Sequence, residues 1–120
     1  MSMRLRTLAG VLAAVAAAAP LAPAAPARPT HASRVITLRM GEYFFTPKVI
    51  HAHLGDVLLV KNVGKIGHTA VDAKGGKILG VPLVQGGKSY HWKLTRPGNA
   101  RFFCTLHPTR MSGRITVTRE

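Results

Sequence analysis

The sequence predicts an all-β domain, a Greek-key β-sandwich or barrel, that follows a short export leader. Short segments in which apolar and polar residues alternate recur from residue 34 to residue 118, and Gly, Pro and Asn separate them. No helical period of useful length follows the leader. Many short strands at this spacing are typical of Greek-key sandwiches and barrels, in which residues far apart in sequence meet at one end of the fold.

Residues 1–32 have the pattern of a secretory signal. Arg4 and Arg6 precede a run of mostly Ala, Leu and Val over residues 8–19, as in a signal peptide, and this run is too short to span a bilayer. Small residues permit cleavage near residue 27 or 32, and a leader that is never cleaved is the alternative. We expect a signal peptide and Ala/Pro-rich leader over 1–32, one small domain over 33–120, and export to the periplasm or outside the cell.

Alternation defines the expected strands in chain order. Over residues 34–40, Ile36, Leu38 and Met40 share one face, and segments 48–54 and 56–61 follow on either side of Gly55. Further strands are expected over residues 89–94, 100–104 and 114–118, and His68 opens another. Turns are expected where Gly, Pro and Asn gather, over residues 62–65, 74–80 and 97–99.

The charge of the chain favours an anionic partner. The net charge is +13, or +11 for a chain that begins at Arg28, after cleavage near residue 27 has removed Arg4 and Arg6. An acidic protein or an anionic membrane surface would suit this charge. Nucleic acid is not expected, because the chain is exported and its Lys and Arg residues form no dense block. The alternative is a surface that keeps the protein soluble and has no partner.

Cys104 is the single cysteine of the chain. Small exported domains usually carry cysteines in pairs as disulfides, and one cysteine cannot form an internal disulfide. Cys104 is therefore buried and inert, paired with another chain, or protected by a bond to a metal.

The neighbours of Cys104 favour a metal site. His107 follows three residues later and Met111 four residues after that, in the loop before the last strand. A tight turn lets the Cys and His donor atoms converge on one ion, and Met111 can approach from a third direction. A fixed trigonal site needs a second imidazole, for which His68 is the obvious donor.

The chain resembles the cupredoxins, the small blue copper proteins such as plastocyanin, pseudoazurin and amicyanin. The resemblance covers the domain after the leader and is carried by Phe45-Thr46-Pro47 with Val49-Ile50, Gly55-Asp56-Val57, Asn62 leading to His68-Thr69, and Phe102 through His107 and Met111 to Val117. It implies one Cu(I)/Cu(II) ion in a type 1 site, with His68, Cys104 and His107 as equatorial ligands and Met111 as a weak axial ligand. Three residues separate His107 from Met111, whereas relatives more often have two or four. The alternative role of Met111 is a core residue.

The resemblance implies a monomeric carrier that passes single electrons between redox proteins with acidic docking surfaces, and that is not an enzyme by itself. Peripheral contact with an anionic membrane surface is compatible with the charge. By resemblance, His107 would reach the surface in an apolar patch with Leu106, Pro108 and Pro82. A periplasmic copper storage or delivery protein is the alternative function. A basic adhesion domain that has lost the metal would be expected to lack a ligand, and none is lacking.

Overall fold

A computed structural model describes residues 32–119 of the chain. Residues 1–31 of the expected signal peptide and leader, with the possible cleavage position near residue 27, lie outside these residues. Within them the fold contains strands and turns only, which confirms the all-β prediction. None of the described residues belongs to a helix long and apolar enough to cross a membrane.

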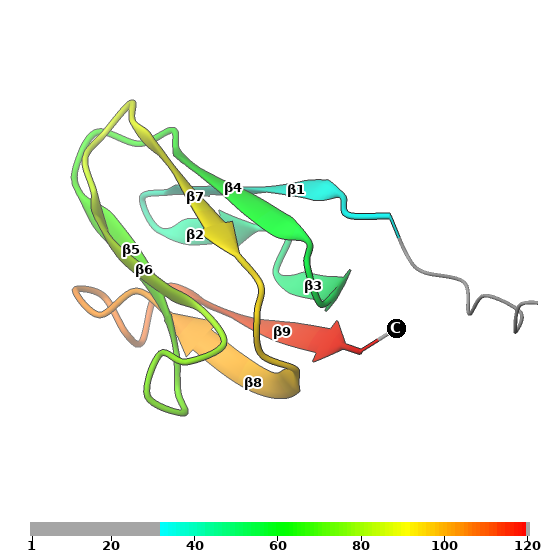
Figure 1. Ribbon diagram of the computed structural model, residues 1–120. Helices are drawn as coiled ribbons and strands as arrows, with labels where there is room; N and C mark the ends of the chain where they lie inside the picture. The colour runs from blue at the N-terminus through cyan, green and yellow to red at the C-terminus, as the bar shows by residue number, and fades with distance from the viewer. Residues whose placement is uncertain (1–31, 120) are drawn as a thin grey trace, which may run out of the picture. The chain divides into compact units, whose positions relative to one another are not determined.

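Two curled sheets face each other (Figure 1). One has the order β2-β1-β4-β7 and the other the order β3-β9-β8-β5-β6. The strands are β1 (Val35–Gly41), β2 (Phe44–Thr46), β3 (Val49–His53), β4 (Val57–Asn62), β5 (His68–Asp72), β6 (Gly80–Val84), β7 (Ser89–Lys93), β8 (Gly98–Phe103) and β9 (Ser112–Thr118). Two pairs, β1 with β4 and β3 with β9, are parallel, and the remaining pairs are antiparallel.

The predicted strands correspond to β1, β3, β4, β5, β7, β8 and β9, whereas β2 and β6 were not expected. The core lies between the sheets and follows the predicted alternation, because Leu38 and Met40 are fully buried while Arg39 is exposed. Phe45 of β2 packs edge-on against Phe102 of β8, with ring centroids 4.8 Å apart. This contact joins the two sheets, since burial of two aromatic rings is strongly favourable.

One end of the sandwich gathers three segments that are far apart in sequence. The first residue of β5, the residue after β8 and the residue before β9 meet there, as His68, Cys104 and Met111. All three side chains are fully buried. The loop between β8 and β9 therefore lies against the start of β5, which is the arrangement that a site built from His68 and Cys104 requires.

Candidate metal centre

The structure brings three of the predicted ligands together in one cluster. One donor atom each from His68, Cys104 and His107 lies within 4.8 Å of the others. His68 Nδ1 is 3.9 Å from Cys104 Sγ, and the centroids of the two imidazoles are 5.4 Å apart. Among residues 32–119 this is the one group of three or more His, Cys, Asp or Glu side chains with such spacing.

The loop from residue 62 to residue 67 fixes the position of His68. The buried Asn62 side chain donates through Nδ2 to the carbonyl oxygens of Ile66 at 2.8 Å and Val84 at 2.7 Å. Its Oδ1 accepts the N–H of Gly64 at 2.8 Å. One side chain thus closes the loop and ties it to β6. Such a buried and fully bonded amide holds its neighbours in a single conformation.

Backbone hydrogen bonds hold the loop that carries Cys104, His107 and Met111. The His107 N–H donates to the Cys104 carbonyl at 3.1 Å, and the Met111 N–H donates to the His107 carbonyl at 3.0 Å. The Cys104 N–H donates in turn to the Met111 carbonyl at 3.2 Å, which closes the loop. Met111 therefore lies beside Cys104 through the backbone, and its side chain is fully buried.

Thr69 connects the two ligand segments, a role that the sequence pattern did not reveal. Its N–H donates to Cys104 Sγ at 3.4 Å. Its hydroxyl lies 2.8 Å from the Thr105 hydroxyl and accepts the Thr105 N–H at 2.8 Å. The residue after His68 is thereby bonded to the residue after Cys104. A donor aimed at the sulfur also stabilises a thiolate.

Glu42, in the turn between β1 and β2, lies behind His68. Its Oε1 is 3.7 Å from His68 Nε2 and accepts the N–H groups of Ile66 at 2.8 Å and Lys65 at 2.7 Å. These two donors hold the pKa of Glu42 below its usual range, so the carboxylate is ionised at neutral pH. A Cβ at position 64 would overlap the Glu42 carboxylate, so a larger residue there would displace this carboxylate from its hydrogen bonds.

Tyr43 covers the other imidazole. Its ring packs edge-on against His107 with centroids 4.8 Å apart, and the Arg110 guanidinium lies over the Tyr43 ring at 3.8 Å. His107 is only partly exposed and its Nε2 is buried. His107 therefore reaches the surface only in part, because Tyr43, in the turn between β1 and β2, packs against its ring. Leu106, Pro108 and Pro82 are exposed as expected.

The chemistry of the cluster fits a soft metal ion. Burial, opposed in part by the Glu42 carboxylate, lowers the pKa of His68 and keeps its imidazole neutral, as metal binding requires. The His68 Nδ1 atom faces Cys104 Sγ at 3.9 Å, whereas its Nε2 atom faces Glu42. Nδ1 is therefore the nitrogen of His68 that could share an ion with the thiol. Two imidazoles and one thiol form a donor set suited to copper.

Comparison with known proteins agrees with this chemistry. The family of copper-binding proteins of the plastocyanin/azurin type has a sequence model that matches residues 32–118. The chain belongs to this family. Copper is accordingly its cofactor, in one site of the type 1 kind. No curated protein matches the sequence significantly.

Solved structures of similar fold include free-standing cupredoxins and part of a larger enzyme. An amicyanin mutant is 22% identical with a TM-score of 0.58, and the match covers 68% of this cupredoxin and 80% of the amicyanin. A plastocyanin from Dryopteris crassirhizoma is 23% identical with a TM-score of 0.56, over 68% of this chain and 98% of the plastocyanin. A copper-containing nitrite reductase from Thermus scotoductus SA-01 is 26% identical with a TM-score of 0.62, over 71% of this chain but only 22% of the reductase.

Proposed function

We propose that this cupredoxin is an exported electron carrier in which His68, Cys104 and His107 are the equatorial copper ligands and Met111 is the axial ligand. The observation that carries the proposal is the buried cluster of two imidazoles and one thiol, whose donor atoms lie within 4.8 Å of one another. The hydrogen bond from the Cys104 N–H to the Met111 carbonyl supports the place of Met111 beside it.

Copper held by two imidazoles, a thiolate and a weak thioether accepts and releases one electron in this kind of site. The task of the protein is to keep the donors in place during that change. Thr69 holds the sulfur, the closed loop holds His107, and Asn62 holds the segment before His68. Because hydrogen bonds within the protein fix all three segments, the geometry can change little between the two charge states, and this favours rapid electron transfer.

Transfer of electrons is favoured over catalysis by the composition of the site. Four protein donors would leave no open position for a substrate, which catalytic metal sites keep. The match to the nitrite reductase covers 22% of that enzyme, so its activity does not transfer to this chain.

We further propose that residues 1–32 direct export and are removed near residue 27 or 32. The mature domain, residues 33–120, would then act as a monomer that meets redox proteins with acidic surfaces.

The test combines colour, electron transfer and metal analysis. The oxidised protein should be intensely blue through sulfur-to-copper charge transfer, and Cys104→Ser should abolish the colour. In stopped-flow mixing with a redox partner, the blue band should bleach while copper stays with this protein. Bleaching with copper passed to an apo acceptor would instead favour delivery or storage, and a colourless copper-loaded protein would contradict the ligand assignment.

A further inference from the structure

A basic groove lies on the outer face of the second sheet, next to the ligand loop but outside the metal centre. It has a volume of about 320 Å³ and is lined by Lys48, Val49, Arg101, Ser112, Gly113 and Arg114. These residues belong to or directly precede the neighbouring strands β3, β9 and β8. We call this feature the arginine groove.

The three cations of the arginine groove are forced close together by the sheet register. Arg101 of β8 and Arg114 of β9 are directly opposite each other, and the Arg114 N–H donates to the Lys48 carbonyl at 2.7 Å. Gly113 permits this approach, since a Cβ there would meet the Lys48 carbonyl oxygen at 2.5 Å. Like charges directly opposite in a sheet are destabilising, so the fold maintains a local repulsion at this place.

No described carboxylate neutralises the arginine groove. The three acidic residues within residues 32–119 are engaged elsewhere: Glu42 with the loop before His68, Asp56 with Arg34, and Asp72 with its own turn. In a chain with 17 Lys and Arg against 4 Asp and Glu, a groove with three cations has no internal source of negative charge in the described part. An occupant from outside the chain would relieve the repulsion.

Both guanidinium groups are held in place but retain free donors. Arg101 lies over the Phe103 ring at 5.4 Å, and its Nη2 donates to the Pro108 carbonyl at 3.3 Å. The Arg114 Nη2 donates to Asn99 Oδ1 at 3.2 Å. Each guanidinium carries five N–H donors in a planar fork that matches a carboxylate. The contact to Pro108 also links the groove to the loop that carries His107.

We propose that the arginine groove is the docking site for carboxylate side chains of an acidic protein partner, seated beside the ligand loop. The proposal rests on the proposed function, because it gives the redox partner a defined place next to the metal centre. Val49, which is 55% exposed, supplies an apolar contact between the cations. A surface that combines cationic side chains with an exposed apolar side chain is more typical of a transient protein interface than of a site for a free anion.

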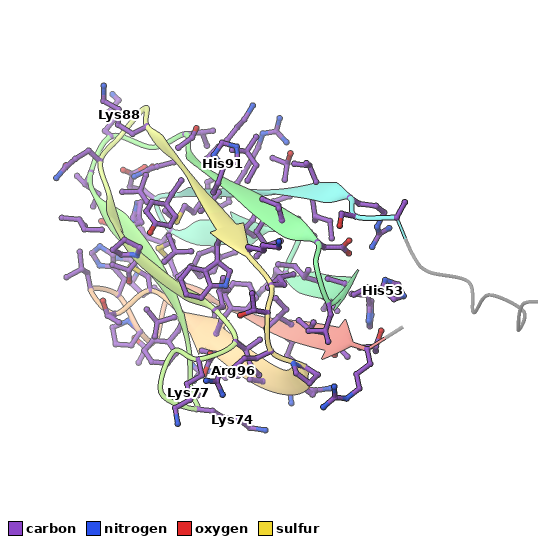
Figure 2. All side chains as sticks on the ribbon, viewed as in Figure 1. His53, Lys74, Lys77, Lys88, His91 and Arg96 are labelled. Atoms are coloured by element: carbon purple, nitrogen blue, oxygen red, sulfur yellow. The ribbon has the colours of Figure 1, made fainter. Side chains whose placement is uncertain are left out.

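The test uses the reduced copper protein, hexaglutamate as the probe, and two matched double variants. The double variant Arg101→Gln/Arg114→Gln removes two positive charges from the arginine groove. Lys74→Gln/Lys77→Gln removes the same charge from the exposed turn between β5 and β6, where both side chains point outward (Figure 2). Nuclear magnetic resonance titration should place the largest amide shifts in β8 and β9. The groove variant should weaken binding about tenfold, as expected for two arginine–carboxylate pairs, and the control less than about twofold.

Three outcomes would overturn the proposal: equal weakening in both variants, amide shifts spread evenly over the surface, or groove-dependent binding to phosphatidylglycerol vesicles with none to hexaglutamate. The last result would assign the groove to a membrane surface. Thermal unfolding of the groove variant should remain at or above that of the parent, since repulsion is removed, and this excludes misfolding as the cause. Blue colour and reversible reduction by a neutral reductant report on the proposed function separately.

Discussion

At the scale of single residues, Glu42 and Tyr43 decide how the imidazoles are enclosed. The residue types and spacing of Cys104, His107, Met111 and His68, together with the resemblance to cupredoxins, predicted a set of four copper ligands. Three of them, His68, Cys104 and His107, lie in one cluster, and the assignment of all four as ligands is a proposal. Glu42 and Tyr43 could not be predicted, because only the pairing of β1 with β4 brings their turn beside the loop before His68.

Replacing Met111 with Leu tests the axial assignment. The variant should keep its copper and show a higher reduction potential, because loss of a thioether donor disfavours Cu(II) more than Cu(I). The free energy of unfolding of the copper-free protein should change by less than about 1.5 kcal/mol, since Met and Leu have similar volumes. Voltammetry and visible spectra provide the measurement. An unchanged potential and spectrum would make Met111 a core residue.

Glu42→Gln tests the charge behind His68. The amide oxygen can still accept the Lys65 and Ile66 N–H groups, but the negative charge 3.7 Å from His68 Nε2 is lost. The reduction potential should rise, because a nearby negative charge stabilises Cu(II) more than Cu(I). Glu42→Ala is the control that also removes the acceptor. If both variants leave the potential unchanged, Glu42 serves only to hold the loop.

Among the strands, the regular alternation of apolar and polar residues made most of them predictable. Two strands, β2 and β6, lack this alternation and were not predicted. β2 has three residues, too few for a periodic signal. β6 begins with Gly80 and contains Pro82, which are unfavourable in strand interiors. Pro82 is tolerated because β6 is at the edge of its sheet, where one side of the strand has no ladder partner. Sequence alone does not reveal which strand occupies an edge.

The turn between β5 and β6 depends on Asp72. Its buried carboxylate accepts the N–H groups of Lys74 at 2.7 Å, Gly76 at 3.1 Å, Ile78 at 2.6 Å and Leu79 at 2.8 Å. Burial alone would raise the pKa of Asp72, but these backbone donors outweigh it and hold the pKa below its usual range. The ionised form therefore stabilises the fold above the unfolded pKa of about 4. That contribution is lost as the pH falls through the lower folded pKa.

Asp72→Asn should lower the free energy of unfolding at pH 7 by about 2–4 kcal/mol, because charge-assisted hydrogen bonds are replaced by weaker ones. The difference from the parent should begin to shrink below about pH 4 and should continue to shrink as the pH falls through the lower folded pKa of Asp72, because the parent carboxylate loses its charge there. Urea denaturation of the copper-free proteins at several pH values measures both effects. Lys74→Gln, an exposed change in the same turn, is the control. A difference that is independent of pH would contradict the role of the charge.

At the scale of the whole molecule, the positive charge is spread rather than concentrated, as the sequence predicted. Lys88 projects from the turn between β6 and β7, whereas Lys74, Lys77 and Arg96 project at the opposite end of the same view (Figure 2). Positive charge distributed in this way attracts an acidic partner from many directions and so raises the rate of encounter. Local features such as the arginine groove then select the final orientation.

The dependence of the electron-transfer rate on salt tests whether the spread positive charge guides an acidic partner toward this protein. The second-order rate with an acidic redox protein should fall steeply as salt rises from about 0.01 to 0.2 M, because the screening length shrinks from about 30 Å to under 10 Å. Lys65→Glu should slow this reaction more than Lys93→Glu, because position 65 lies in the loop before His68 while Lys93 is opposite Val57 at the far end of β4. A neutral small-molecule reductant should show little dependence on salt or on either variant, since no charged encounter precedes its reaction. Equal slowing by the two variants would mean that net charge alone guides the partner. A rate that does not respond to salt would mean that an acidic partner is not the physiological one.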